Sequence, residues 1–462
     1  MALQVHDKSE EVQEMAIHWN VISDLLGGTD ALRSKPIHMP QQPAESDEDY
    51  AYRLQTATVF PAFARTAGVL AGKPFSQEII LNDDVPAQIK ALAQDIDGEG
   101  RSLHAFASQA FAVAAIQKGF GGILVDYTKI GGEAKSLHDE RKMGARPYWV
   151  FIHPEQVLGW KVGGFGGQKY LTQLRLQENI KRDDGGFGEA IVERIRVLEP
   201  GKWFIYEKLA SGWAIVDKGV TSLQRIPFVP IYGEREGFMK GKPPLLELAY
   251  QNIKHWQQQS DQDASTRFNS KRLLVFTGLN DGDKIVLSSS SGVTLPQGAD
   301  AKIVQGSAEA VTVGRSELEA LEDQMIQTGA ELLVQKTGQR TATESTNDAE
   351  ANKSALQRNT ENFEDSIDQA MQFTAQWLNL PEGGHCSLFK DFSAATLSDA
   401  TAQVILGMYQ AGIVGKKTVI QEQKRRGVLS PDVDPETEIA EVEAEGPSLG
   451  VMNDNSQRAI AE

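Results

Sequence analysis

A long stretch that begins with two prolines and reads as one helix constrains the fold of this chain most. Pro243 and Pro244 suit the first turn of a helix, where a missing N–H costs no hydrogen bond. Over residues 245–268 a helix would be about 36 Å long at ~1.5 Å per residue. Its second half is rich in Gln, Asp, Ser and Thr, so it needs either water in a channel or a neighbouring copy of the same helix. Apolar residues recur at helical spacing only in the first half, at Leu245, Leu248, Ile253 and Trp256.

The composition is that of an ordinary soluble globular protein with enough apolar material for a core. Of the 462 residues, 40% are hydrophobic and 24% are charged. The longest apolar-leaning run, residues 103–116, is too short and too polar to span a bilayer. The N-terminal sequence MALQVHDKSEE predicts no signal peptide. The single cysteine, Cys386, excludes an intrachain disulfide framework and fits a reducing cytosol.

The charge balance limits how the chain can meet nucleic acid. Its 63 acidic and 46 basic residues give a net charge of −17. Proteins that grip DNA gain affinity by displacing counterions from phosphates, and they normally need a basic surface to do so. We therefore expect no tight binding to nucleic acid over a large area. A protein that handles DNA without holding it remains compatible with this charge.

Hydrophobic periodicity predicts helices and strands in a defined order. Helices are expected within residues 12–26, 46–72, 86–96 and 102–118, with a capping box at Ser46 and Asp49 and a kink at Pro61. A buried strand follows at 122–127, and an antiparallel meander at 147–231. Beyond the long helix come a β-rich insert at 272–314 with its last strand at 310–314, helices at 316–334 and 347–380, a short strand at 387–392, and helices at 398–411 and 418–426.

No motif in the sequence supplies a catalytic or metal-binding constellation. Residues 163–167, GGFGG, depart from the dinucleotide pattern and predict a hairpin turn. Residues 415–418, GKKT, lack the spacing and the preceding strand of a Walker motif. Residues 95–100 resemble part of a calcium loop but lack ligands, and the isolated pair His385 and Cys386 has no partners for zinc. We therefore expect no enzymatic activity, no cofactor and no metal.

Two charged helices leave alternatives open. The helices at 398–411 and 418–426 could form a helix-turn-helix that reads bases. The favoured interpretation is structural, because basic residues near a helix C-terminus also interact favourably with the helix dipole. These basic residues are Lys416, Lys417, Lys424, Arg425 and Arg426. The helix at 316–334 holds acidic residues and no lysine or arginine. A solvated face is the usual explanation, and a polyanionic partner kept at a distance is the alternative.

Five segments, in this order, resemble the portal proteins of tailed bacteriophages, the connector ring through which DNA enters and leaves the capsid. The first two are DYAYRLQTATVFPAFARTAGVLAGKPF at 49–75 and DIDGEGRSLHAFASQAFAVAAIQKGFGGILVDY at 95–127. The third is IPFVPIYG at 226–233, which leads into LLELAYQNIKHWQQQSD at 245–261. The last two are SALQRNTENFEDSIDQAMQFTAQWLNL at 354–380 and GIVGKKTVIQEQKRRGVL at 412–429. The resemblance covers residues 46–429 and rests on the order of these features, since portals share fold order more than motifs.

The resemblance implies an α+β fold built from the parts of a small portal and assembled as a ring. These parts are a wing at 1–244, a stem helix at 245–268, a clip at 269–314, a returning stem helix at 315–334, a tunnel loop at 335–345, a long wing helix with a strand at 346–396, and a helical crown at 397–430. The acidic tail at 431–462 is expected to be disordered, because it lacks an apolar period.

The resemblance also implies partners and a location. The ring, a homo-oligomer and by expectation a dodecamer, would pass double-stranded DNA without sequence specificity during packaging and ejection. It would contact the terminase large subunit, head–tail adaptor proteins, and the major capsid and scaffolding proteins. We expect it in the virion at the portal vertex, after assembly in the host cytoplasm, with no membrane contact. The alternatives are another non-enzymatic head–tail adaptor or virion structural protein and, less favoured, a DNA-processing enzyme.

The candidate site residues follow from these parts. Acidic residues of the returning stem helix would line the channel, where like charges at ~4 Å in water interact by only about 1 kcal/mol, so that DNA is repelled gently. These residues are Glu317, Glu319, Glu322, Asp323 and Glu331. Lys336 and Arg340 in the tunnel loop would make transient phosphate contacts. Clip residues expected to meet the motor or an adaptor are Asn280, Asp281, Asp283 and Lys284.

Overall fold

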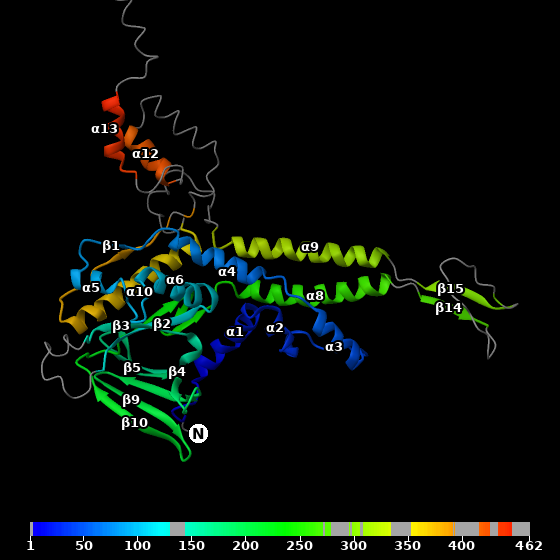
Figure 1. The fold of residues 1–462 in the computed structure, drawn as a ribbon, viewed down its shortest axis with the longest axis horizontal. Helices are drawn as coiled ribbons and strands as arrows, with labels where there is room; N and C mark the ends of the chain where they lie inside the picture. The colour runs from blue at the N-terminus through cyan, green and yellow to red at the C-terminus, as the bar shows by residue number, and fades with distance from the viewer. Residues whose placement is uncertain are drawn as a thin grey trace, which may run out of the picture. The chain divides into compact units, whose positions relative to one another are not determined.

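The structure is a computed structural model. It describes residues 3–129, 144–270, 273–278, 295, 298–304, 308–333, 353–390, 392, 415–425 and 433–445. The chain divides into two compact units, Met1–Phe389 and Lys390–Glu462. Helices and antiparallel sheets together build the first unit (Figure 1), so the expected α+β class is confirmed. Among the described residues, no helix is both long and apolar enough to cross a membrane.

Four α-helices form the N-terminal part. They are α1 (Glu10–Leu26), α2 (Gly28–Arg33), α3 (Asp47–Thr56) and α4 (Ala62–Gly72), with short 3-10 turns η1 (Pro36–His38) and η2 (Lys73–Phe75). The Ser46 hydroxyl accepts a hydrogen bond from the Asp49 N–H, as the capping signature predicts. The expected continuous helix over 46–72 is wrong, because the chain leaves the helix after Thr56 and resumes at Ala62. Pro61 lacks an N–H and its ring clashes with a helical carbonyl, so it separates two helices.

The next helical segment ends in an unusual geometry. After α5 (Ala87–Leu92) and α6 (Leu103–Ala110), the chain continues as a π-helix, η3 (Phe111–Gln117). The Lys118 N–H donates to the carbonyl of Val113, five residues earlier, at 2.8 Å. The helix expected at 102–118 is therefore present, but its second half is wound more loosely than an α-helix. The α-helix within 86–96 is shorter than expected.

Two antiparallel sheets follow. The first has the order β11-β2-β3, and the second is an antiparallel meander in the order β10-β9-β8-β5-β4. Their strands are β2 (Phe120–Tyr127), β3 (Pro147–Ile152), β4 (Val157–Phe165), β5 (Gln168–Gln177), β8 (Arg194–Glu199), β9 (Lys202–Leu209), β10 (Gly212–Val220) and β11 (Phe228–Tyr232). The meander expected over 147–231 is confirmed only in part, because β3 pairs with β2 in the first sheet. The GGFGG segment forms the predicted hairpin, with positive φ at Gly166 and Gly167 between β4 and β5.

Smaller elements complete the sheets. Besides the β14–β15 pair described below, three two-stranded ladders of described residues lie outside the two larger sheets. They pair β1 (Ile80–Leu81) with β16 (Cys386–Ser387), β6 (Ile180–Asp183) with β7 (Glu189–Val192), and β12 (Glu234–Gly237) with β13 (Lys240–Lys242). A single-turn 3-10 helix, η4 (Pro154–Gln156), joins β3 to β4.

The main hydrophobic core lies between α1 and the two sheets. Trp19 of α1 stacks on Phe120 of β2 with ring centroids 6.2 Å apart, and both side chains are fully buried. Leu174 from the meander and Phe228 from β11 belong to the same cluster. The core therefore ties the first helix to both sheets and gives the unit a rigid base.

Helices α8 (Leu246–Ser270) and α9 (Ala308–Ala330) extend from this base side by side, and α10 (Ala355–Leu378) lies against the β11-β2-β3 sheet (Figure 1). The strands β14 (Leu273–Thr277) and β15 (Asp300–Val304) pair between α8 and α9 in the sequence. The strand expected at 310–314 is wrong, because these residues form the first turns of α9. Packing against α8 overrides the β-branched propensity of this short segment.

The second unit holds two described helices, α12 (Lys416–Arg425) and α13 (Pro435–Glu445). The expectation of disorder is wrong for Pro435–Glu445. The Asp434 carboxylate accepts hydrogen bonds from the Thr437 N–H and hydroxyl at 3.0 and 2.7 Å, which caps the helix start. Acidic residues in the first turn also suit the helix dipole. The helix expected at 398–411 lies outside the described residues, so the helix-turn-helix alternative stays a prediction.

Candidate functional site

The first half of α8 is fixed to the N-terminal helices. Asn252, which is 1% exposed, accepts a hydrogen bond from the Phe63 N–H at 2.9 Å and donates to the Phe60 carbonyl at 2.8 Å. One side chain of α8 thus pairs the Phe63 N–H in the first turn of α4, and it adds a second donor to the Phe60 carbonyl, which also accepts from the Ala62 N–H at 2.9 Å. Trp256 is fully buried one turn later. This half of α8 therefore belongs to the rigid base.

The second half of α8 has little to bury, as the sequence indicates. Beyond Trp256, Ser260 is the only buried position of α8, and Phe268 keeps an exposed fraction of 54%. Polar contacts replace apolar packing here. Asp261 lies beside Arg53 and accepts a hydrogen bond from Gln42 at 2.8 Å, and burial raises the pKa of this carboxyl despite the nearby Arg53.

Helix α9 runs beside α8 and packs on it through one apolar stripe (Figure 1). Leu318, Leu321 and Met325 of α9 are buried at helical spacing. The Gln262 side-chain amide donates to the Val311 carbonyl at 2.8 Å, and a side chain in place of Gly314 would collide with Gln262. The two helices therefore pack closely along the polar part of α8 as well.

The five acidic residues expected to line a channel do not share one face of α9. Glu322 is turned inward, because its carboxylate lies 3.0 Å from Nε2 of His255, a ring that is 3% exposed. Glu319 forms an ion pair with Arg315 at 3.2 Å, a residue of α9 that lies outside the predicted helix. At 3.6 residues per turn, Glu317 and Glu319 lie on opposite flanks of the helix. Asp323 is exposed on the side away from α8. Glu331 is exposed just beyond the end of α9, where it lines a pocket with Leu246 and Glu247 of α8.

The face of α9 opposite α8 is polar, small and acidic. Its exposed positions, at helical spacing, are Glu309, Ser316, Ala320, Asp323 and Gln327, with Thr312 and Val313 on its two sides. Glu309 precedes the predicted start of the helix and was therefore not among the predicted site residues. The other predicted site residues, Lys336, Arg340, Asn280, Asp281, Asp283 and Lys284, lie outside the described residues.

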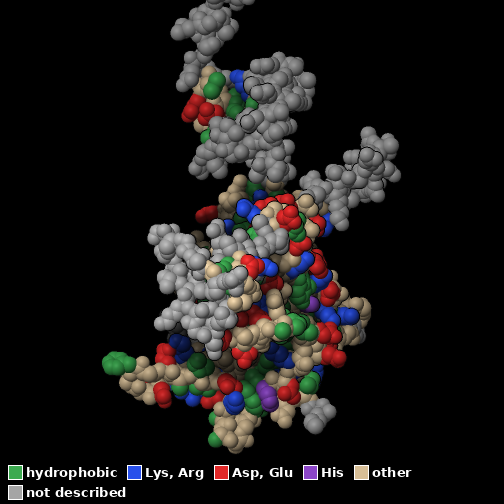
Figure 2. Space-filling view, turned by 90° about the vertical axis from the view of Figure 1, so that its right-hand side faces the viewer, with side chains coloured by type: hydrophobic (Ala, Val, Ile, Leu, Met, Phe, Trp, Pro, Cys, Tyr) green, Lys and Arg blue, Asp and Glu red, His purple; other side chains and the backbone are tan. Residues whose placement is uncertain are grey.

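Charged side chains elsewhere serve structural purposes. Burial alone would lower the pKa of Arg196, but Asp126 and Glu178 outweigh it and raise that pKa above its usual value. Burial, together with Asp126, raises the pKa of Tyr148 to about 12. Positive and negative side chains intermingle over the described part of the face in Figure 2. In the ranges that the structure describes, no group of three or more His, Cys, Asp or Glu side chains is placed to hold a metal ion.

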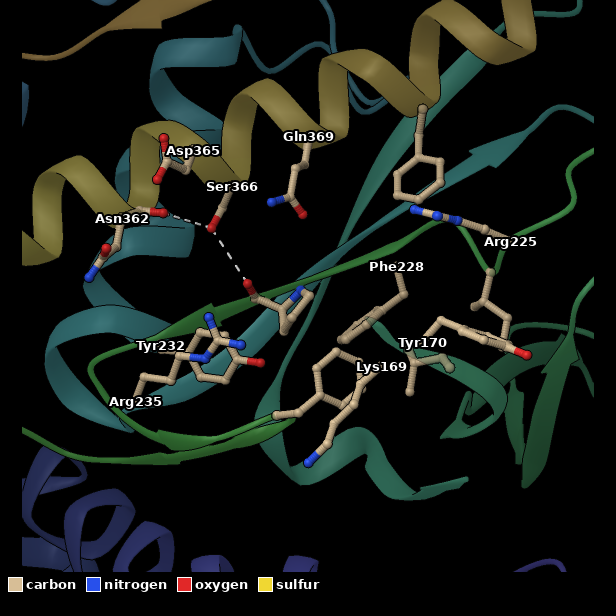
Figure 3. A pocket seen from close by; sticks show the side chains of 15 residues that line it. Lys169, Tyr170, Arg225, Phe228, Tyr232, Arg235, Asn362, Asp365, Ser366 and Gln369 are labelled. Atoms are coloured by element: carbon tan, nitrogen blue, oxygen red, sulfur yellow. Dashed lines mark hydrogen bonds between the residues drawn. The ribbon is translucent and has the colours of Figure 1, made fainter. Parts of the chain in front are cut away.

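A groove opens between α10 and the strands β5 and β11 (Figure 3), with a cavity volume of about 330 Å³. Asn362, Ser366 and Gln369 project into it from α10, and Arg225 and Arg235 stand at its two ends. Sequence reasoning missed this groove. Its only local signal is the alternation of Phe228, Pro230 and Tyr232, since a proline within a strand pattern marks a sheet edge. The α10 wall comes from more than 120 positions further along the chain.

Comparisons with known proteins give one family and several structures. Residues 244–378, which span α8 to α10, match a family described as "Domain of unknown function (DUF4055)". No curated protein matches the chain. Among solved structures, this chain is similar to a chain in the neck of a native gene transfer agent (GTA) particle computed with C12 symmetry. The TM-score is 0.41 and the sequence identity is 12%, and the match covers 83% of this chain and 95% of that chain.

Two further structures are similar at the same level. The neck of an empty GTA particle computed with C6 symmetry has a TM-score of 0.40 and 12% identity, with 84% of this chain and 95% of that chain covered. A chain in the virion of a native gene transfer agent particle has a TM-score of 0.40 and 12% identity, covering 83% and 94%. Because these scores and identities are low, the function proposed below is built from the chain's own residues.

Proposed function

We propose that this chain is a phage portal protein, a ring subunit whose copies form the channel for double-stranded DNA at one vertex of a capsid. The observation that carries the proposal is the α8–α9 pair. One end of α8 is fixed in the rigid base, and its other half is polar and little buried within the chain. Copies around an axis would give that half the neighbouring surface that one chain lacks.

The acidic face of α9 supports a channel wall. In a ring, the copies of Glu309 from all subunits would form one circle of negative charge, and the copies of Asp323 would form another. Ser316 and Ala320 would lie between the two circles and Gln327 beyond the second, all of them small or neutral side chains. Such a wall attracts no phosphates, and salt screens its charges within ~8–10 Å. A duplex would therefore slide past it. Glu322 has a different role in this proposal, since its contact with His255 holds the two helices together.

The rest of the proposal follows from the same assembly. The ring is a dodecamer of non-enzymatic subunits in the virion, assembled in the host cytoplasm. Its partners are the terminase large subunit, head–tail adaptors, and the capsid and scaffolding proteins. Another head–tail adaptor or virion structural protein is the alternative that the experiment must separate from a portal.

Negative-stain electron microscopy of the purified full chain tests the assembly. We expect rings with a central hole wide enough for a DNA duplex, and a monomer without a hole would overturn the proposal. Packaging assays then test the channel face. Glu309→Gln with Asp323→Asn should change the packaging rate or DNA retention, whereas the control Glu317→Gln with Glu319→Gln, which removes the same charge from the flanks, should change them less. Equal effects of the two pairs would exclude this face as the channel wall.

A further inference from the structure

We propose that the groove between α10 and the strands β5 and β11 binds an acidic peptide segment of a partner protein, and that one aromatic or aliphatic side chain of the peptide enters the groove. This inference is independent of the proposed ring. It rests on an apolar floor, on a rim of cations that form no ion pair with the described residues, and on a sheet edge that is closed to an added strand.

The floor of the groove is apolar and already ordered. Leu171, Ile226 and Phe228 line it and are all buried in the chain, 8%, 4% and 4% exposed. Phe228 and Leu171 belong to the main core, so the floor does not need the ligand to form. A preformed pocket of about 330 Å³ with an apolar floor and polar walls is at the small end of the range for ligand sites. It suits one inserted side chain better than a large ligand.

The rim carries three cations that the chain leaves available. Lys169, Arg225 and Arg235 line the groove and are exposed. None of the three forms an ion pair with a described residue, whereas Arg53, Arg182, Arg194 and Arg196 are all paired with carboxylates. Arg235 is held over the Tyr232 ring at 5.0 Å from its centroid, which positions its guanidinium at one end.

The rim favours an anionic partner despite one carboxylate. Asp365 of α10 lines the groove opposite the cations (Figure 3). Three cations against one carboxylate leave a positive local balance in a chain whose net charge is −17. A complementary partner is therefore acidic, and opposite charges at a rim raise the association rate and select the partner.

The edge of β11 excludes recognition by strand addition. β11 is the outer strand of its sheet, but Pro230 has no N–H to offer at that edge. The Pro230 carbonyl accepts a hydrogen bond from the Ser366 hydroxyl at 3.5 Å. A bound segment must therefore be recognised through side chains. Asn362 and Gln369 can serve it, because neither side-chain amide has a hydrogen-bond partner among the described residues.

A peptide fits the groove better than nucleic acid. Single-stranded nucleic acid needs a basic track along the backbone and exposed aromatic faces for successive bases. Here Phe228 of the floor is recessed, Tyr170 is the one exposed aromatic side chain of the lining, and the three cations surround a single cavity. A short acidic segment with a single apolar anchor matches both the size and the charge of the site.

Fluorescence anisotropy with the full chain tests the proposal. The probe is a fluorescein-labelled heptapeptide of glutamate and aspartate with a central phenylalanine. We expect saturable binding that weakens as salt is raised. Arg225→Glu with Arg235→Glu should weaken it at least about tenfold, and Tyr170→Ala at the rim should weaken it less. The control Lys161→Glu with Lys218→Glu, the same charge change at exposed positions outside the groove, should leave the affinity unchanged.

Three results would overturn the proposal. The first is equal binding of the peptide whose phenylalanine is replaced by alanine, since the apolar floor would then play no part. The second is equal loss of affinity in the control variant, which would show attraction to the overall charge alone. The third is equal affinity for a thymidine oligonucleotide of the same charge, which would show that the groove does not select a peptide. Circular dichroism of each variant confirms that it is folded before its affinity is compared.

Discussion

Replacing Asn252 by alanine should loosen the joint between α8 and the N-terminal helices. The side chain of Asn252 closes the gap around Pro61 with two hydrogen bonds, from the Phe63 N–H and to the Phe60 carbonyl. Alanine is a good helix former and keeps the α8 backbone intact. The variant therefore removes the two hydrogen bonds with little other change.

The magnitude follows from what the variant leaves unpaired. Phe63 is fully buried, so its N–H would lose its partner without gaining water, which costs about 1–3 kcal/mol. Phe60 is 40% exposed, so water can replace the amide at its carbonyl, and that loss is about 0.5–1.5 kcal/mol. Together the two changes lower the free energy of local opening at the start of α4 by about 1.5–4.5 kcal/mol.

Hydrogen exchange measured by mass spectrometry resolves this local opening. Amides in the first turn of α4 should exchange about 10- to 1,600-fold faster in the variant, since about 1.4 kcal/mol corresponds to a factor of ten. The matched control is Gln251→Ala, one position earlier on α8, where the side-chain oxygen has no hydrogen-bond partner. That control should change exchange by no more than about 0.5 kcal/mol. Unchanged exchange at α4 in the Asn252 variant, or an equal effect in the control, would refute the reasoning.

Three more outcomes are expected. Arg196→Ala leaves the partly buried carboxylates of Asp126 and Glu178 without their cation, so it should lower the free energy of unfolding of the first unit by about 3–5 kcal/mol, measured by calorimetry. The control Arg182→Ala removes a more exposed cation and should lower it by less than about 1 kcal/mol. Gly119→Ala should prevent native packing, because the φ angle of residue 119 is +73° and a Cβ there would lie 2.1 Å from the backbone carbonyl carbon of Lys242. The measurement is the yield of soluble protein, which should fall. The hydrogen bond that the His385 ring donates to the Asp84 carboxylate raises the pKa of His385 above its usual 6.5 and lowers the pKa of Asp84. The protection of the β1–β16 pair should therefore be fullest from about pH 4 to 6.5 and should fall as pH rises through the His385 pKa. In hydrogen exchange corrected for pH, His385→Gln should abolish this change.

Local sequence signals predicted much of the fold because their causes are local. The Ser46 cap and the hairpin at Gly166 depend on residues within a few positions of each other, and both are confirmed. The break between α3 and α4 was predicted only as a kink. Its stabilising partner, Asn252, lies 189 positions beyond Phe63, so no local pattern could reveal it.

Parts of the candidate site could not be predicted from the sequence, because they depend on contacts between distant segments. The spacing of acidic residues predicted a charged helix correctly, but it could not show that Glu322 turns toward His255. Glu309 was missed because Val311 and Val313 favour a strand when read alone. The groove beside α10 joins segments from three distant parts of the sequence, and its cations resemble ordinary surface residues until their lack of partners is seen.

The start of α8 is fixed by backbone packing, which determines how forces on its polar half reach the rest of the chain. A Cβ on Gly241 would lie 2.2 Å from the Gly119 carbonyl oxygen, and one on Gly119 would meet the Lys242 backbone at 2.1 Å. Two glycines thus allow the end of β13 to press against the start of β2 just before Pro243. Such contacts between backbones cannot yield by rotating a side chain, and Asn252 adds a second attachment two turns along. We therefore expect α8 to move with the β11-β2-β3 sheet as one body, so that a load on its polar half is carried into the sheet without a hinge.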